Sequence, residues 1–280
     1  MSHHSLASLD ELKHIARRIR INTVKMIGAA GSGHPGGSLS EVELLTALYF
    51  RIMRHDPKNP NWPDRDRFIL SKGHGCPALY ATYAEAGYLD PALLNTLRKL
   101  GSPLQGHPDK RMLPVLEAST GSLGQGLSIG IGTALAAKLD EQDYHTFVMV
   151  GDGEIEEGQN WEAAMFAGFH KSANLTCIVD NNRQQLDGFV KDILDPAPVA
   201  EKFRAFGWRA LEVDGHDFAE VIPALELARA GQEGKPTAIV AHTIKGKGVS
   251  FMENNPEWHG IAPKPEQVNA AVKELEMAAV

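Results

Sequence analysis

The sequence predicts an α/β protein with a doubly wound, mostly parallel sheet flanked by helices. Two observations predict this class. Five short apolar runs have the length and composition of buried strands, and segments with helical periodicity separate them. This alternation is typical of a parallel sheet with helices on both faces. Because no internal repeat, low-complexity segment or long linker divides the chain, we interpret residues 1–280 as one domain.

The amino-terminal quarter is expected to contain two helices joined by a loop. Residues 8–11 have the spacing of a capping box, and apolar residues then recur at helical intervals up to a break at Gly28. Residues 31–37 are too rich in glycine for a regular element, so we expect a loop there. A second helix should begin after residues 38–40 and continue through Tyr49.

Each of the five apolar runs continues directly into polar or glycine-rich residues. The runs are residues 68–70, 147–150, 175–179, 211–213 and 238–240. Helices are expected between them, notably over residues 158–170 and 217–230. In a doubly wound sheet, ligands bind beyond the carboxyl ends of the strands. We therefore expect the chemistry in the five loops that follow these runs, together with residues 31–37.

Residues 120–139 have the pattern of a helix whose first half is rich in glycine. The four glycines are Gly124, Gly126, Gly130 and Gly132. Each interior glycine costs a helix up to about 1 kcal/mol relative to alanine, so we expect a compensating close contact. That contact would lie under a bound cofactor or across a subunit interface. A closing helix is expected within residues 262–280.

Composition argues against several classes of function. The chain is 43% hydrophobic, enough for a substantial core, and its formal net charge of -7 provides no basic stripe for nucleic acid. Its two cysteines, Cys76 and Cys177, lie in or beside apolar runs, which fits a reducing compartment. The first 20 residues lack the apolar core of a signal peptide, and no apolar run approaches about 18 residues. We expect a cytoplasmic protein without a membrane span.

Two loops predict a bound metal and diphosphate. Gly151-Asp152-Gly153 follows one predicted strand, and Asn181-Asn182 follows the next. Each is a common turn sequence by itself, but a right-handed crossover places both at the same edge of the sheet. Asp152 and Asn182 then offer one charged and one neutral oxygen, which suits Mg²⁺. The acidic residues 154–157 argue against a bare phosphate there, so we infer a diphosphate bridged to the protein by Mg²⁺.

Histidine is the second chemical signal. The chain has 12 histidines, and His34, His74, His107 and His259 lie beside glycine or proline in predicted loops. A lone histidine is usually a partly buried, hydrogen-bonded ring, but these flanking residues favour an imidazole that reaches a ligand. Their spacings fit no compact zinc pattern. Imidazole suits proton transfer because its unperturbed pKa lies near neutrality.

Seven short motifs follow one another along the chain. They are SGHPGG, LSKGHG, QGHPD, TGSLGQG, GDGE, DNN and KGKGVSFMENNPEWHG, and they cover almost the whole chain. The sequence resembles the amino-terminal half of transketolases, and its GDG and NN pair resembles the thiamine-diphosphate motif. The resemblance implies the thiamine-diphosphate-binding fold of the diphosphate-binding (PP) type. It also implies thiamine diphosphate with Mg²⁺ as cofactors, Ca²⁺ or Mn²⁺ being substitutes for the metal.

The resemblance also implies roles for individual residues. Metal ligands would be the side chains of Asp152 and Asn182 and the backbone carbonyl of Gln184. Cofactor contacts would come from His74, Gly121, Ser122, Leu123, Asp152, Gly153, Glu154, Asn182, Lys245 and His259. Catalytic histidines would be His34 and His107, which hydrogen-bond the substrate and move protons, and His74 and His259 at the reacting centre. Glu157 and Glu162, otherwise solvated helix charges, would form an acidic catalytic cluster near the cofactor and a subunit interface.

The implied reaction is transfer of a two-carbon ketol unit from a ketose phosphate to an aldose phosphate, as in the pentose phosphate pathway. In transketolases the cofactor-activating glutamate belongs to a second, pyrimidine-binding domain, which we do not find in this sequence. We therefore expect a partner polypeptide to supply it, most simply in an α2β2 assembly, and this chain to be inactive alone. The alternatives are the α subunit of a 2-oxoacid dehydrogenase E1 component and a non-catalytic thiamine-diphosphate-binding subunit.

Overall fold

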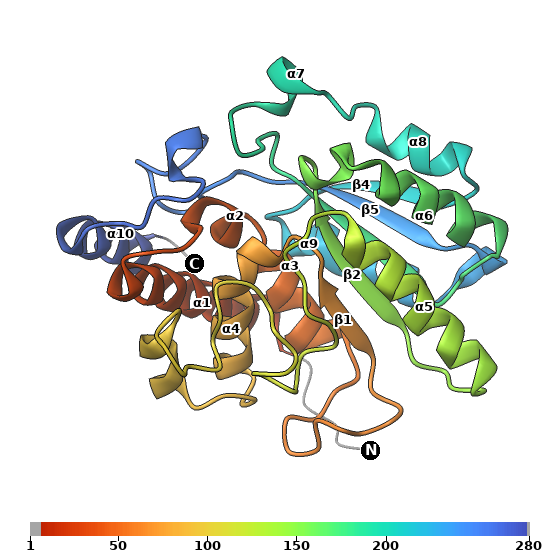
Figure 1. The fold of residues 1–280 in the computed structure, drawn as a ribbon, viewed down its shortest axis with the longest axis horizontal. Coiled ribbons are helices and arrows are strands. Elements are labelled where there is room, and N and C mark those ends of the chain that lie inside the picture. The colour runs from red at the N-terminus through yellow and green to blue at the C-terminus, as the bar shows by residue number, and fades with distance from the viewer. Residues whose placement is uncertain (1–6, 279–280) are drawn as a thin grey trace.

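The fold is built on one parallel sheet. The computed structural model describes residues 7–278, and these form a five-stranded, all-parallel sheet in the order β1-β2-β3-β5-β4 (Figure 1). The strands are β1 (Arg67–Leu70), β2 (Thr146–Gly151), β3 (Leu175–Asn181), β4 (Arg209–Asp214) and β5 (Thr237–His242). All five predicted apolar runs are strands. Each observed strand is slightly longer than its predicted run, and β3 begins at the first residue of its run.

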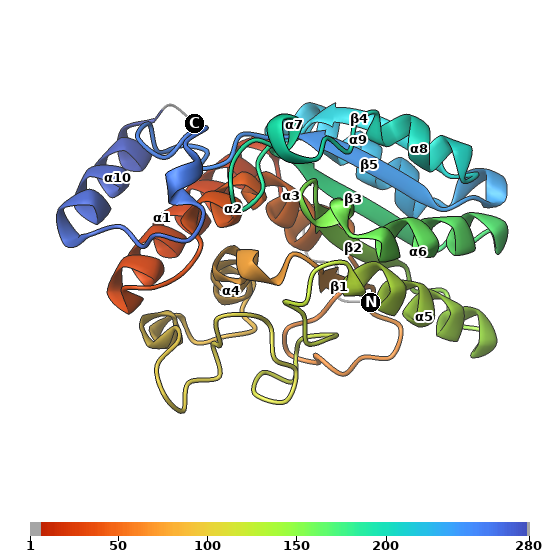
Figure 2. The same ribbon diagram turned by 45° about the horizontal axis from the view of Figure 1, so that its top comes forward.

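Helices cover both faces of the sheet, which confirms the doubly wound class (Figure 2). In β2, Phe147 and Met149 face one core, whereas Val148 and Val150 face the other, as expected of a strand buried on both sides. The first core is closed by α1 (Leu9–Ala30), α3 (Val42–Ala47), α4 (Cys76–Glu85) and α9 (Phe218–Arg229). The second is closed by α5 (Gln125–Leu139), α6 (Gly158–Phe169) and α8 (Val199–Ala205).

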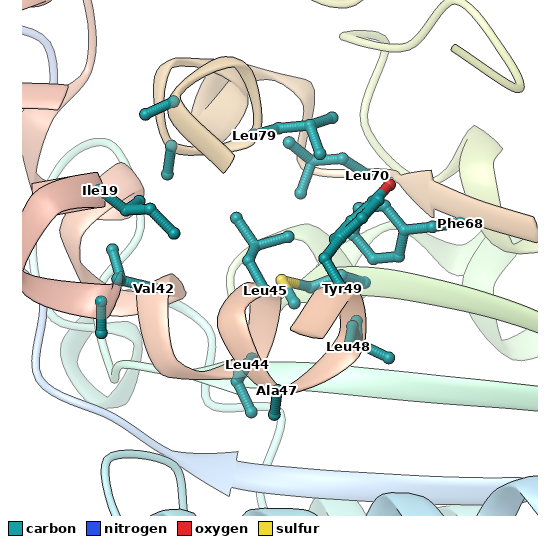
Figure 3. Close-up of a cluster of buried hydrophobic side chains, with 14 of the residues drawn as sticks. Ile19, Val42, Leu44, Leu45, Ala47, Leu48, Tyr49, Phe68, Leu70 and Leu79 are labelled. Atoms are coloured by element: carbon teal, nitrogen blue, oxygen red, sulfur yellow. The ribbon is translucent and has the colours of Figure 1, made fainter. Parts of the chain in front are cut away.

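The first core is the larger of the two, and Figure 3 shows its packing beside β1. Leu45 and Tyr49 lie against Phe68 and Leu70 there, all of them buried. The Tyr49 hydroxyl is satisfied by the hydroxyl of Tyr83, 3.3 Å away. This apolar wall fixes α3 and α4 on the sheet and thereby the loops that precede them.

The first helix confirms the predicted capping box, but it does not end at Gly28. Ser8 and Glu11 cap each other's backbone, and α1 runs on to Ala30, where Gly31 takes the left-handed conformation (φ 62°). A Cβ on Gly28 would lie 2.3 Å from Val268 of α10 (Pro265–Met277). Gly28 is therefore a packing glycine that lets α10 approach α1, rather than a helix break.

The expected loop over residues 31–37 is only half correct. A short helix, α2 (Pro35–Ser40), begins inside it, with Pro35 at a position where its fixed φ suits a helix start. A Cβ on Gly36 would lie 3.0 Å from the carbonyl oxygen of Trp258. The second expected helix is accordingly divided into α2, α3 and a π-helical turn (Leu48–Ile52).

The glycine-rich helix is also shorter than predicted. It begins at Gln125, because Gly121 (φ 135°) and Gly124 (φ 84°) hold the preceding residues in a loop. The structure shows what compensates the interior glycines: a Cβ on Gly126 would lie 2.3 Å from Ser71 Oγ, and one on Gly130 equally close to Val148 Cγ2. These two glycines let α5 lie directly on the sheet. Gly132, in contrast, meets nothing within 4 Å in the described chain.

The remaining elements are short. They are α7 (Val190–Ile193) and the 3-10 turns Gly73–Gly75, Pro91–Thr96, Glu154–Glu156, Gln232–Gly234 and Pro256–Trp258. The helices predicted over residues 158–170 and 217–230 are α6 and α9, and the closing helix is α10, with residues 279–280 outside the described range. Among the described residues, no helix combines the length and apolar character that a bilayer crossing requires.

Candidate active site

A pocket of about 360 Å³ lies beyond the carboxyl ends of four neighbouring strands. Lys72 follows β1, Asp152 follows β2, Asn182 follows β3 and Lys245 follows β5, and all four side chains line the pocket. The parallel arrangement thus delivers one polar side chain from each strand to a single place.

The loop after β4 does not contribute to this pocket, contrary to expectation. Because β4 is an edge strand beyond β5, its loop lies to one side of the pocket. His216 in that loop instead contacts Glu43, with Nδ1 2.9 Å from the carboxylate.

The pocket brings together most of the predicted site residues. Those lining it are His34, His74, His107, Gly121, Leu123, Asp152, Gly153, Glu154, Glu157, Asn182, Gln184, Lys245 and His259. Ser122 and Glu162 lie outside it, and both are exposed. Glu162 lies on α6 among exposed apolar side chains, and Ser122 lies in the loop before α5.

The four candidate histidines converge although they come from four separate segments. The ring centroid of His34 lies 5.4 Å from those of His74 and His259 and 6.1 Å from that of His107. The centroids of His74 and His259 are 5.3 Å apart. His34 directly precedes α2, His74 lies in the turn after β1, and the other two lie in loops. The glycine and proline flanks predicted imidazoles that reach a ligand, and the four rings do line one pocket.

Burial lowers the pKa of all four imidazoles, which favours their neutral form. Burial, with Arg98, His107 and Lys245 adding to it, lowers the pKa of His34 to about 4. Burial and then Lys245 lower the pKa of His259 to about 3. Lys245 Nζ donates to His259 Nδ1 at 2.9 Å, so the hydrogen of that ring is on Nε2. Because Nδ1 of His259 is engaged by Lys245, its Nε2–H is the group left to donate to a ligand.

The predicted metal ligands share one corner of the pocket. The carboxylate of Asp152 accepts hydrogen bonds from the backbone N–H groups of Gly153, at 2.9 Å, and Arg183. Arg183 directly follows Asn182 and is in the left-handed conformation (φ 65°). The backbone carbonyl of Gln184 faces Lys245 Nζ at 3.5 Å. The β2 and β3 loops are therefore in contact, as the strand order requires.

This corner fits a hard cation and a diphosphate. Burial, with Asp180 adding to it, raises the pKa of Asp152 to about 7, which indicates a buried charge that lacks full compensation. Both polar atoms of the buried Gln184 amide have no hydrogen-bond partner within residues 7–278. A Cβ on Gly153 would lie 2.5 Å from Gln185 Cβ, so a larger residue would clash with the β3 loop. Without a side chain at this position, a phosphate can approach the backbone closely. One carboxylate with neutral oxygens is the ligand chemistry of Mg²⁺.

Two buried residues of the site carried no predicted role. Asp180 accepts hydrogen bonds from Lys72 Nζ at 2.5 Å, Ser40 Oγ at 2.6 Å and Asn182 Nδ2 at 3.0 Å. The NH₂ group of Asn182 is engaged by Asp180, which fixes the orientation of the amide. Its side-chain oxygen accepts the Gln184 N–H at 3.2 Å and keeps a second lone pair that a cation can use. Asp180 is the first residue of the DNN motif, and Lys72 lies in the LSKGHG motif. Their places in these motifs are the signal that could have identified them.

Glu154, predicted to contact the cofactor, lines the pocket and also holds the pocket loops together. Its carboxylate accepts the backbone N–H groups of Gly124 and Gly151, each at 3.0 Å, and the Ser71 hydroxyl. It thereby joins the ends of β1 and β2 to the start of α5. Its acidic neighbour Glu157, in contrast, is exposed at the pocket rim.

Known proteins share this sequence and fold. Residues 12–279 match the family described as "Transketolase, thiamine diphosphate binding domain". The chain is 48% identical to the 6-deoxy-6-sulfo-D-fructose transketolase subunit SqwG of Clostridium sp. (strain MSTE9), over 95% of this chain and 96% of the relative. It is 44% identical to an apulose-4-phosphate transketolase subunit of Actinobacillus succinogenes, over 96% of this chain and 97% of the relative.

Longer relatives match over only part of their length. Transketolase of Rattus norvegicus is 42% identical over 93% of this chain but only 41% of its own. The crystal structure of transketolase from Campylobacter jejuni superposes with a TM-score of 0.90 and 33% identity, over 96% of this chain and 43% of that chain. The chain thus spans about two-fifths of these transketolases. It belongs to the transketolase family, in which it corresponds to the thiamine diphosphate binding domain.

Proposed function

We propose that this chain is the diphosphate- and metal-binding subunit of a two-subunit transketolase that moves a two-carbon ketol unit from a ketose phosphate to an aldose phosphate. One observation supports this most directly: four strand ends and four histidines build a single pocket with a metal-binding corner. The family match favours this function over that of the α subunit of a 2-oxoacid dehydrogenase and over a non-catalytic role.

The corner formed by the β2 and β3 loops would hold Mg²⁺. Asp152 and Asn182 would bind through side-chain oxygens and Gln184 through its carbonyl, with Ca²⁺ or Mn²⁺ as substitutes. The described residues contain no group of three or more His, Cys, Asp or Glu side chains arranged to hold a metal. Phosphate oxygens and water would therefore complete the coordination, which couples metal affinity to the diphosphate.

The rest of the pocket would hold the cofactor and the sugar. His74, Lys245 and the bare backbone at Gly153 would bind the diphosphate, and Gly121 and Leu123 would lie against the ring system. When bound, thiamine diphosphate supplies the nucleophilic carbon that ketol transfer requires. His34 and His107 would donate hydrogen bonds to the oxygens of the sugar and exchange protons with its hydroxyl groups.

A partner polypeptide would close the pocket. Beside it, α5, the loop before α5, and α6 expose apolar side chains, which we call the α5–α6 face: Leu123, Ile129, Met165, Phe166 and Phe169. An apolar patch of this kind is typical of an interface. Glu162 lies on the same face, which supports its predicted place near a subunit boundary. The partner would supply the pyrimidine domain and the activating glutamate, most simply in an α2β2 assembly.

The sugar substrates and the compartment belong to the same proposal. Relatives of this chain are named for 6-deoxy-6-sulfo-D-fructose and apulose 4-phosphate, so a role in the pentose phosphate pathway is one of several. We place the protein in the cytoplasm because its two cysteines, Cys76 and Cys177, are buried free thiols.

The proposal is tested by reconstitution. The purified chain is assayed for ketol transfer at saturating thiamine diphosphate and Mg²⁺, first by itself and then after addition of the partner polypeptide. Donor ketoses carrying a terminal phosphate or sulfonate are compared with a panel of aldose phosphate acceptors. We expect turnover only in the reconstituted enzyme. Turnover by the chain alone would refute the two-subunit mechanism, and decarboxylation of 2-oxoacids without ketol transfer would refute the reaction.

A further inference from the structure

Arg98 joins two of the loops that position the catalytic histidines. It follows the turn at Pro91–Thr96 and does not line the pocket. One terminal nitrogen donates to Ser32 Oγ at 2.8 Å, in the loop before α2. The other donates to the carbonyl of Gly106 at 3.3 Å, next to His107, and lies 3.4 Å from His34 Nδ1.

The chemistry of this contact determines where the hydrogen of His34 resides. A guanidinium group is always protonated and can only donate hydrogen bonds. The ring nitrogen facing it, Nδ1, must therefore present its lone pair, and the hydrogen of the neutral ring must be on Nε2. We propose that Arg98 is a positioning residue that fixes His34 in its Nε2–H tautomer, so that a donor faces the sugar oxygens.

The absence of a side chain at Gly106 makes room for the Arg98 guanidinium. A Cβ on Gly106 would lie 2.8 Å from Arg98 Nε and 2.9 Å from its Cζ, so only glycine lets the group rest there. Arg98 itself is in the left-handed conformation (φ 58°), held by its N–H donating to the Leu104 carbonyl at 2.8 Å. Non-glycine residues keep this conformation where their surroundings determine it, which is common at functional sites.

The charges around His34 act in the same direction. The ring faces Arg98, His107 and Lys245, and it contacts the rings of His74 and His259. Burial, and then Arg98, lower its pKa to about 4, which keeps it neutral over the working range. Removal of the guanidinium should therefore allow the hydrogen of the His34 ring to reside on either nitrogen. It should also raise the pKa of the ring.

The tautomer can be measured without substrate or partner, which separates this inference from the proposed function on which it rests. Long-range proton–nitrogen NMR of the ¹⁵N-histidine-labelled chain reports the state of each His34 nitrogen as the pH is lowered. We expect a single Nε2–H form in the unmodified chain. In Arg98→Ala we expect a mixture of tautomers and a titration midpoint moved up toward the ordinary histidine value.

Two further variants keep the test valid if Arg98→Ala folds poorly. Gly106→Ala leaves Arg98 in place but obstructs its seat, so it should give the same tautomer mixture. Arg98→Lys keeps the charge without the fork of donors and should restore the wild-type state only in part. Arg111→Ala is the control, since Arg111 is an exposed arginine that pairs only with Asp109 among the described residues. An unchanged Nε2–H form in both Arg98→Ala and Gly106→Ala would refute the proposal.

The reconstituted enzyme provides the functional readout. Arg98→Ala should lower kcat/KM by about tenfold, the effect of one charge-assisted hydrogen bond, and should move the acidic limb of the pH profile upward. Cofactor affinity should stay unchanged. A uniform loss of activity at every pH together with weaker cofactor binding would contradict positioning and indicate a general structural defect. A tautomer shift in an enzyme that is inactive in all forms would uphold the positioning role and refute the proposed function.

Discussion

Asp152, which lines the pocket, and Asp180, which does not, are both buried and act on each other through their charges. Lys72 compensates Asp180 directly, with Nζ 2.5 Å from its carboxylate. Within the described chain the hydrogen-bond donors to Asp152 are backbone N–H groups, and Lys245 acts on it only through its charge. A buried carboxylate with so little compensation is costly unless a cation binds it. The same surroundings that make the charge of Asp152 unfavourable therefore favour a metal.

Replacement of Asp152 by asparagine tests this role. Asp152→Asn keeps the shape of the side chain but removes its charge, so we expect metal-dependent binding of thiamine diphosphate to weaken by at least about 100-fold. Titration calorimetry of the assembled enzyme, with and without Mg²⁺, measures the effect. Asp187→Asn, at an exposed carboxylate of the neighbouring loop, should change nothing. Wild-type affinity in Asp152→Asn would exclude this residue as a metal ligand.

The histidines should divide into two groups when each is changed to alanine. His34→Ala and His107→Ala should slow turnover by about 100-fold or more while cofactor binding remains nearly intact, because these rings are assigned to the sugar. His74→Ala should weaken cofactor binding as well, since His74 lies in the turn after β1 beside Lys72. Steady-state kinetics and calorimetry distinguish the two effects. Identical behaviour of all three variants would overturn the assignment.

At the scale of elements, the glycines of α5 determine how closely this helix packs on the sheet. Gly126 and Gly130 let this helix lie directly on β1 and β2, whereas Gly132 faces away from the sheet. The contact positions and the exposed position thus follow the helical period on opposite faces of one element.

A matched pair of substitutions separates these positions. Gly130→Ala would bring a methyl group within 2.3 Å of Val148 Cγ2, so we expect it to lower the free energy of unfolding by about 1–3 kcal/mol. Gly132→Ala meets no atom of the described chain and should raise it by about 0.5–1 kcal/mol, since alanine favours helix. Urea unfolding of the isolated chain gives both values. Equal effects would show that α5 is not seated on the sheet by its glycines.

The strands were predictable because each is an apolar run that ends in a polar loop. Local patterns failed where a residue's role is set by a distant segment. Gly28 has the character of a helix break in sequence, but the approach of Val268 from α10 explains it. The start of α2 was missed because, in sequence, glycines that permit close packing inside a helix cannot be told from glycines of a loop.

The site was predictable to a similar extent. Motifs located the residues of the pocket, and the parallel sheet explains why they meet. The sequence did not show which way each side chain points. Glu154 faces the backbone of Gly124 and Gly151, and Glu162 lies on the exposed surface of α6. Arg98 has no distinctive sequence context at all, because its contacts with Ser32 and His34 span more than sixty positions.

At the scale of the whole molecule, the apolar surface is unevenly distributed. The α5–α6 face is carried by helices that Figure 1 shows at the opposite end of the molecule from α1 and α10. Phe169 is 80% exposed on this face. Exposed aromatic surface of this kind supports our proposal that the partner polypeptide binds here.

A charge on this face should prevent assembly. Phe169→Glu should abolish association with the partner polypeptide, or self-association of the chain, while its unfolding transition stays within about 0.5 kcal/mol of the wild type. Sedimentation velocity measures the assembly. Leu100→Glu is the control, because Leu100 is fully exposed but lies outside this face. Loss of assembly in both variants, or in neither, would show that the α5–α6 face is not the interface.

The four strand ends that build the pocket come from positions 72 to 245 of the chain. A pocket assembled from such distant segments is present only when the entire sheet has formed. No fragment or partly opened form can then retain affinity for the cofactor, so bound cofactor stabilises the molecule against global opening. Amide hydrogen exchange should show this as slower exchange at the most protected amides of the central strands, and not only at the loops that touch the ligand.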